Sequence, residues 1–145
     1  MTLVELALVL GIIGILAAIA IPGYLGYSKK VQLQRVVADI RLIETTLTEF
    51  YFEWKCYPPS LAAVGQDRVL DPWGNPYQYL QIQCGPPQNM AHARKDRSLH
   101  PLNSTFDLYS MGPDGRSVAP LTARASQDDI IRANDGKYIG LASDY

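Results

Sequence analysis

The sequence predicts an α+β fold in which a long N-terminal helix, apolar in its first half, packs on a small antiparallel β-sheet. Two observations lead to this class. An apolar block is followed by a periodic helical stripe, and the remainder is rich in turns and short strand-like runs. The 145 residues suffice for one modest domain. The formal net charge is −1 and no basic patch is interleaved with aromatic residues, so no nucleic-acid partner is expected.

The apolar block runs from Leu6 to Ile21 without a charged side chain. With its flanks it spans 3–25, which reaches the roughly 20 apolar residues that a helix needs to cross a bilayer. A secretory signal peptide is disfavoured because no basic region precedes the block and no small-residue cleavage site ends it. A buried core helix is disfavoured because the segment is apolar on every face. We therefore expect a transmembrane or filament-core helix over 1–27 and a globular domain outside the cytoplasm over 28–145.

The second half of the predicted helix carries an apolar stripe. Apolar residues recur at alternating spacings of three and four, namely at Leu33, Val36, Ile40, Ile43, Leu47, Phe50 and Trp54. This spacing places them on one helical face. A single helix from Thr2 to about Trp54 would be roughly 80 Å long. A two-stranded coiled coil is the alternative, but the chain after Lys55 supplies enough strands to cover the stripe.

Pro22 weakens the end of the apolar block. Proline removes a backbone donor and clashes with the carbonyl four residues earlier, which belongs to Ala18. Gly11 and Gly14 each lower helix propensity by about 1 kcal/mol relative to alanine. We therefore expect the stretch Gly14–Pro22 to bend, or to lose regular helix, when subunits crowd together.

The chain after the long helix is predicted to form turns and short strands. Strand-forming runs are found at 77–84, 106–110 and 137–142. Residues 61–64 are expected to form a short helical turn, and 134–136 a tight turn before the last strand. The polar segment 89–103 lacks periodicity and is expected to be a loop. A long irregular excursion is expected over 111–133.

Two stretches resemble a known family. The opening TLVELALVLGIIGILAAIAIP resembles the N-terminal signature of mature type IV pilins and type II secretion pseudopilins, with an acid at position five and proline at twenty-two. LDPWGNPYQYL followed by FDLYSMGPDG resembles the major pseudopilin of type II secretion. The resemblance implies a pilin-like fold and a filament subunit rather than an enzyme, and the sequence contains no nucleophile elbow or phosphate loop. The alternatives are the major pilin of a surface type IV pilus and a membrane-anchored binding module.

The resemblance also implies processing, partners and location. A prepilin peptidase removes a short basic leader and the new N-terminus is methylated, which assigns methylation to Met1, where the family usually has phenylalanine. Expected partners are copies of the same chain, an inner-membrane assembly platform and minor pseudopilins. The subunit is expected in the bacterial inner membrane before assembly and in a periplasmic or cell-surface filament afterwards.

Glu5 is the carboxylate at the edge of the apolar block. An unpaired carboxylate in hydrocarbon is costly, so it should pair or become protonated. Given the resemblance, the available cation in a stack of parallel helices is the N-terminal ammonium of Met1 on a neighbouring subunit. Glu5 would then set the register of assembly. The alternative is that Glu5 marks the membrane interface and reaches water.

Cys56 and Cys84 are the two cysteines of a domain expected outside the cytoplasm, which favours one disulfide between them. The alternatives are two free thiols or a bond between subunits. Neither a metal site nor a cysteine nucleophile is expected with His92 and His100, because these histidines lack suitable spacing.

Calcium is the cofactor that the resemblance implies, because the major pseudopilin binds it in the corresponding loop. The ligands assigned in this way are Asp114, Asp128, Asp129 and the backbone carbonyl of Met111, with Asp135 as an alternative. Calcium takes six to eight oxygen ligands from carboxylates and carbonyls. From their spacing alone, these aspartates are interpreted as solvated turn and helix-cap residues.

Overall fold

A computed structural model describes residues 2–145, so the methylation expected at Met1 lies outside the described residues. The chain divides into two compact units, one ending at Gln32 and one spanning Leu33–Tyr145. Helix α1 (Leu3–Trp54) contributes its first half to one unit and its second half to the other. The membrane boundary expected at residue 27 stays a prediction.

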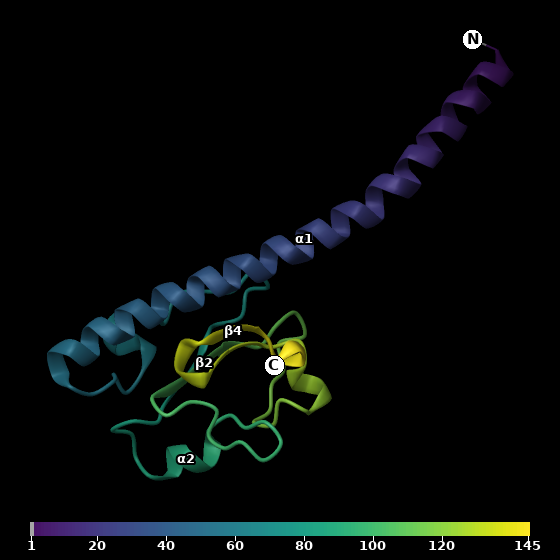
Figure 1. Ribbon diagram of the computed structural model, residues 1–145. Helices are drawn as coiled ribbons and strands as arrows, with labels where there is room; N and C mark the ends of the chain where they lie inside the picture. Colours follow the sequence, from purple (N-terminus) through teal and green to yellow (C-terminus); the bar gives the residue numbers. More distant parts are fainter. Residues whose placement is uncertain (1) are drawn as a thin grey trace. The chain divides into compact units, whose positions relative to one another are not determined.

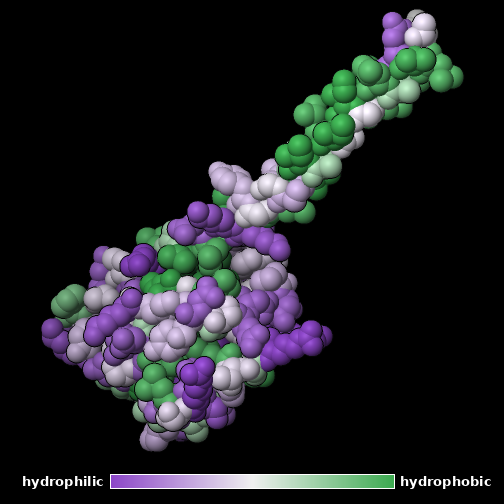
Figure 2. Space-filling view, turned by 45° about the vertical axis from the view of Figure 1, so that its right-hand side comes forward, coloured by the Kyte–Doolittle hydropathy of each residue, from purple (hydrophilic) through white to green (hydrophobic). Residues whose placement is uncertain are grey.

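The predicted single helix is confirmed, since α1 continues through Pro22 without a break. In the unit that ends at Gln32, apolar side chains cover the surface of α1 (Figure 2). Within residues 2–145, α1 is the one helix whose length and composition suit a membrane span. The loss of helix expected at Gly14–Pro22 concerns the assembled filament and stays a prediction.

The second unit contains a four-stranded antiparallel sheet with its strands in chain order. The strands are β1 (Gln78–Gln81), β2 (Phe106–Ser110), β3 (Ile130–Ala133) and β4 (Tyr138–Leu141). In the register, Tyr79 lies opposite Leu108 and Ile131 opposite Gly140. The second half of α1 runs along this sheet (Figure 1). The predicted fold class, a helix packed on a small antiparallel sheet, is thereby confirmed.

The apolar stripe of α1 forms one side of the core. Its fully buried members pack against both the turns and the strands: Val36, Ile40, Ile43 and Leu47 contact a cluster with Leu61, Tyr77, Phe106, Leu108 and Ile130. The stripe ends earlier than predicted, because Trp54 is exposed and stacks on Phe50 with ring centroids 6.1 Å apart. The helix stops there, since Lys55 has a positive φ of 57°.

A second apolar cluster covers the opposite face of the sheet. It consists of Leu102, Leu121, Ile131, Ala133 and Ala142. Because successive strand residues point to opposite faces, Ile130 joins the helix-side core and Ile131 joins this second cluster. The sheet therefore lies between α1 and the long loops, and β3 is buried along its whole length.

Three sequence-based assignments are corrected. The run 77–84 is strand only at β1, and Cys84 lies beyond that strand with a positive φ of 65°. The loop expected at 89–103 overlaps a short helix, α2 (Gln88–His92). The excursion expected over 111–133 is shorter, because its last four residues form β3. The sequence did not predict this strand, since it is covered on both faces and shows no polar–apolar alternation. The short helical turn and the strands expected at 106–110 and 137–142 are confirmed.

The predicted disulfide joins Cys56 to Cys84, with the two Cα atoms 5.8 Å apart, an ordinary separation for a disulfide. It links the segment that follows α1 to the segment that follows β1. The part of the chain that the structure describes contains no free cysteine.

Candidate functional site

Glu5 lies in the first turn of α1 and forms a capping box with Thr2. The backbone N–H of Thr2 donates to Glu5 Oε2 at 2.6 Å, and the Thr2 hydroxyl donates to the same oxygen at 3.0 Å. The N–H of Glu5 lies 3.3 Å from Thr2 Oγ1. Sequence reasoning considered only a neighbouring cation or water as partners for Glu5. The Thr-x-x-Glu spacing in TLVE is the signal that would have revealed this local partner.

The apolar side chains after Glu5 are exposed on all sides of α1 in the unit that ends at Gln32. Leu8 is 63% exposed and Ile19 is 72% exposed. A large exposed apolar surface marks contact with protein or membrane. Because this surface encircles the helix, the segment can insert into a bilayer or be surrounded by other apolar helices.

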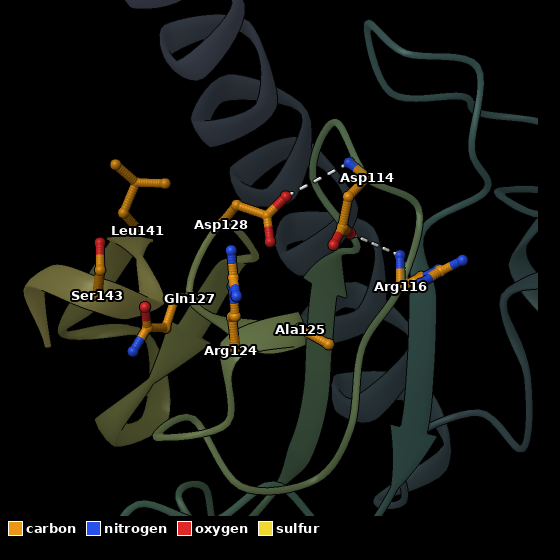
Figure 3. Close-up of a pocket in the computed structure, with 8 residues that line it drawn as sticks. All are labelled: Asp114, Arg116, Arg124, Ala125, Gln127, Asp128, Leu141 and Ser143. Atoms are coloured by element: carbon orange, nitrogen blue, oxygen red, sulfur yellow. Dashed lines mark hydrogen bonds between the residues drawn. The ribbon is translucent and has the colours of Figure 1, made fainter.

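Asp114 and Asp128 come together at an open pocket on the excursion between β2 and β3 (Figure 3). The N–H of Asp114 lies 3.3 Å from Asp128 Oδ2, and Asp114 Oδ1 accepts the N–H of Arg116 at 2.8 Å. Arg124 also lines this pocket. Arg116 contacts Asp114 through its backbone N–H, and its side chain points away from both carboxylates in Figure 3. The other residues that line the pocket are Ala125, Gln127, Leu141 and Ser143.

Asp129 is fully buried and is paired with Arg94. Arg94 Nη2 donates to Asp129 Oδ2 at 2.6 Å, and the Ser117 hydroxyl donates to the same oxygen at 2.5 Å. Burial raises the pKa of Asp129 to about 6, although the hydrogen bond from Ser117 and the charge of Arg94 act to lower it. Among residues 2–145, the buried side-chain polar atoms without a hydrogen-bond partner are Asp129 Oδ1 and Arg94 Nε.

The remaining expected ligands lie at different places. Met111 directly precedes Gly112, where an added Cβ would collide with the backbone carbonyl of Asp128. Asp135 lies at the other end of β3 from Asp129, where it accepts the N–H of Ser104 at 2.9 Å and the Ser104 hydroxyl at 2.7 Å. Within residues 2–145, no three histidine, cysteine, aspartate or glutamate residues are grouped so as to hold a metal ion.

The expected calcium ligands are thus only partly brought together. Asp114 and Asp128 are neighbours, whereas Asp129 faces a guanidinium group. A divalent cation at Asp129 would lie beside the positive charge of Arg94 and be repelled by it. This donor set fits calcium poorly, and the expectation of a calcium site rests on the family resemblance alone.

Sequence reasoning does not identify Arg94 and Ser117. Both lie in polar segments without periodicity, where a single arginine or serine forms no pattern. The available signal is charge balance. The excursion over 111–129 holds three aspartates and two arginines, so one carboxylate lacks a basic partner within the segment.

Comparison with known proteins identifies the family. The chain is 30% identical over 150 residues to the type II secretion system core protein G of Escherichia coli (strain K12), with 89% of this chain and 86% of that one covered. The chain belongs to the type II secretion system core protein G family. The core protein G of Klebsiella pneumoniae is 29% identical over 157 residues, which cover 94% of each chain. Fimbrial protein Q of Moraxella bovis is 44% identical over 70 residues, or 48% of this chain and 43% of its own.

Membership of the core protein G family confirms the pilin-like resemblance found in the sequence. The relatives are components of secretion systems and fimbriae rather than enzymes, which confirms the expected structural role. No family profile matches the chain. No solved structure matches it.

Proposed function

We propose that this protein is the major subunit of a type II secretion pseudopilus and polymerises through the first half of α1. The observation that carries the proposal is the match to core protein G over 89% of the chain, which includes both the apolar helix and the sheet. The apolar surface around residues 3–25 supports it, because such a surface needs lipid or neighbouring helices to cover it.

The proposed cycle begins with the subunit anchored in the bacterial inner membrane by α1. Prepilin peptidase processes the chain, and the domain built on the sheet lies in the periplasm. An inner-membrane assembly platform then moves the subunit into a filament of identical subunits, together with minor pseudopilins. The apolar side chains of α1 exchange lipid contacts for contacts with other helices, so the exposed surface is covered at both stages.

The methylated N-terminus of Met1 on one subunit pairs in this proposal with Glu5 of its neighbour. The capping box already holds the Glu5 carboxylate at the N-terminal end of α1 through Thr2. An ammonium group brought there by a neighbouring helix would be neutralised in an apolar surrounding, where charge pairing is strong. Subunits would then join at one relative height.

The stretch Gly14–Pro22 is proposed to lose regular helix in the filament. Pro22 cannot donate to the Ala18 carbonyl, and the glycine lowers helix propensity. Freed backbone groups can be satisfied by packing among neighbouring helices. A reconstruction of the filament checks this expectation, and continuous helix through Ala18 and Pro22 would contradict it.

A second candidate function is the major pilin of a surface type IV pilus. The match to fimbrial protein Q favours it, but that match covers 48% of this chain. A pilin would share the N-terminal helix and differ in what the filament does.

Deletion of the gene in its host separates the two functions. A pseudopilus subunit is needed for protein release, so the deletion should remove a set of proteins from the culture medium, and a plasmid copy should restore them. Surface pili and adhesion should be unaffected. An unchanged set of released proteins with loss of surface filaments would instead support the pilin function.

A further inference from the structure

Arg94 is a buried cation placed between β2 and the excursion 111–129. It is 4% exposed and Asp129 is 0% exposed. The Arg94 guanidinium stacks over the ring of Tyr109 in β2, 4.2 Å from the ring centroid. Both charges have therefore left water and depend on each other.

One guanidinium group holds the excursion at two distant points of its sequence. Nη1 donates to the Ser117 hydroxyl and, at 3.0 Å, to the carbonyl of Val118, while Nη2 donates to Asp129. The N–H and the carbonyl of Val118 are also bound by the Ser126 hydroxyl, at 3.0 and 2.8 Å. Arg94 thus joins the middle of the excursion, at Ser117 and Val118, to its end at Asp129.

The backbone around Arg94 is fixed as firmly as its side chain. The Arg94 N–H donates to Asp107 Oδ2 in β2 at 2.6 Å. Lys95 donates to the carbonyl of Ala119 at 3.1 Å and accepts the N–H of Leu121 at 2.9 Å. The guanidinium therefore reaches Asp129 from a preformed position and loses little freedom when it binds.

We propose that Arg94 is the internal cation that holds the excursion 111–129 on the sheet, so that this segment folds without a bound divalent ion. A calcium ion bound to Asp129 Oδ2 would lie 2.3–2.6 Å from that oxygen. Arg94 Nη2 already occupies a position 2.6 Å from it. The charge that a metal would neutralise at Asp129 is neutralised by the protein itself. Asp114 and Asp128 accept backbone N–H groups of the excursion itself, from Arg116 and Asp114 respectively.

The experiment compares thermal unfolding of the full chain in detergent, followed by near-ultraviolet circular dichroism, in calcium and in chelator. We expect the same Tm for the unaltered protein in both conditions. Arg94→Ala should lower Tm by roughly 10–20 °C, because it leaves a buried carboxylate without its cation. It should also expose the excursion to proteolysis. Arg116→Ala removes an exposed arginine of the same excursion and should change Tm little.

A double-mutant cycle isolates the pair. The Tm losses of Arg94→Ala and Asp129→Ala should not add in the double variant, since either change alone already breaks the pair. Should Arg94→Ala fail to fold, Arg94→Lys tests the role of the guanidinium group. Lysine keeps the positive charge but lacks the planar group that binds Ser117 and Asp129 at once. Additive losses, or a Tm of the unaltered protein that rises with calcium and falls with chelator, would overturn the proposal.

Discussion

Gly136 is a residue whose missing side chain lets the turn between β3 and β4 lie against α1. Its φ is +88°, and a Cβ at this position would collide with Glu44 Oε1 of α1. That carboxylate accepts Arg132 Nε at 2.8 Å, and Arg132 in turn donates to the Phe106 carbonyl at 3.2 Å. The turn, the helix and two strands therefore meet at one point, where the position of Glu44 is fixed.

Gly136→Ala should lower the free energy of unfolding by about 2–4 kcal/mol, the cost of a positive φ plus that of displacing a bound carboxylate. Gly74→Ala is the matched control, since Gly74 has φ +89° but nothing within 4 Å of a Cβ. It should cost only about 1–2 kcal/mol, for the backbone alone. Urea unfolding of both variants checks this, and equal losses would show that the Glu44 contact is readily relieved.

Asp135 makes the stability of the fold depend on pH. Burial raises its pKa, but hydrogen bonds from Ser104 and Thr105 and the charge of Arg132 lower it more, so the pKa lies below the usual 3.8. A group with a lowered pKa in the folded state stabilises the protein above its unfolded pKa, and this stabilisation is lost as pH falls through the folded pKa.

Asp135→Asn should therefore be less stable than the unaltered protein at neutral pH. The difference should shrink as the pH falls below 3.8, where the aspartate also becomes neutral. Asparagine tolerates the positive φ of 53° at this position, so the backbone is not strained by the change. Urea unfolding across this pH range measures the effect. A difference that stays constant with pH would show that the charge of Asp135 is not its cause.

Single residues were predictable where the sequence itself restricts their chemistry. Two cysteines can form one internal disulfide, and that pair is present. Arg94 was not predictable, because its partner Asp129 lies 35 positions away and is brought near only by the folded loops. The capping box of Glu5 was predictable from the Thr-x-x-Glu spacing.

At the scale of elements, periodicity decided what could be predicted. The buried face of α1 repeats every three or four residues, and β2 alternates, so both were found with accurate bounds. β3 was missed because the sheet is covered by α1 on one face and by loops on the other. Its sequence, Ile-Ile-Arg-Ala, offers no alternation. The buried Arg132 forms an ion pair with Glu44 of α1 at 2.8 Å, a partner that lies far away in the sequence.

The disulfide is an element-scale restraint, since it closes a loop between α1 and the end of β1. Its cysteines are 28 positions apart, and a bridge over this span stabilises the fold by about 3–4 kcal/mol through the entropy of the unfolded chain. Replacing both cysteines with serine should lower the free energy of unfolding by that amount, as measured by urea unfolding. Reductant should destabilise the unaltered protein equally and leave the double variant unchanged. A reductant effect on the serine variant would mean that another process is being measured.

At the scale of the whole molecule, the two units differ in whether their apolar side chains are buried. The domain on the sheet buries apolar residues of its own chain in two clusters. The helix up to Gln32 keeps its apolar residues exposed and gains a covered surface only from lipid or from other copies. One chain therefore combines a domain with its own apolar core and a segment whose apolar surface depends on its surroundings, as expected of a subunit that moves from membrane to filament.

Glu5 allows the assembly proposal to be tested against its simplest rival, a purely local capping role. The carboxylate accepts two hydrogen bonds from Thr2, which a neutral glutamine can also accept at this position of a capping box. If charge pairing with the neighbouring N-terminus sets the register, Glu5→Gln should insert in the membrane yet assemble as poorly as Glu5→Ala. Thr2→Ala, which loses the hydroxyl and keeps the charge, should assemble. Filament yield and length by negative-stain microscopy, with membrane insertion measured in parallel, report the result. Normal filaments from Glu5→Gln alongside poor ones from Thr2→Ala would assign Glu5 to helix capping and remove it from the contact between subunits.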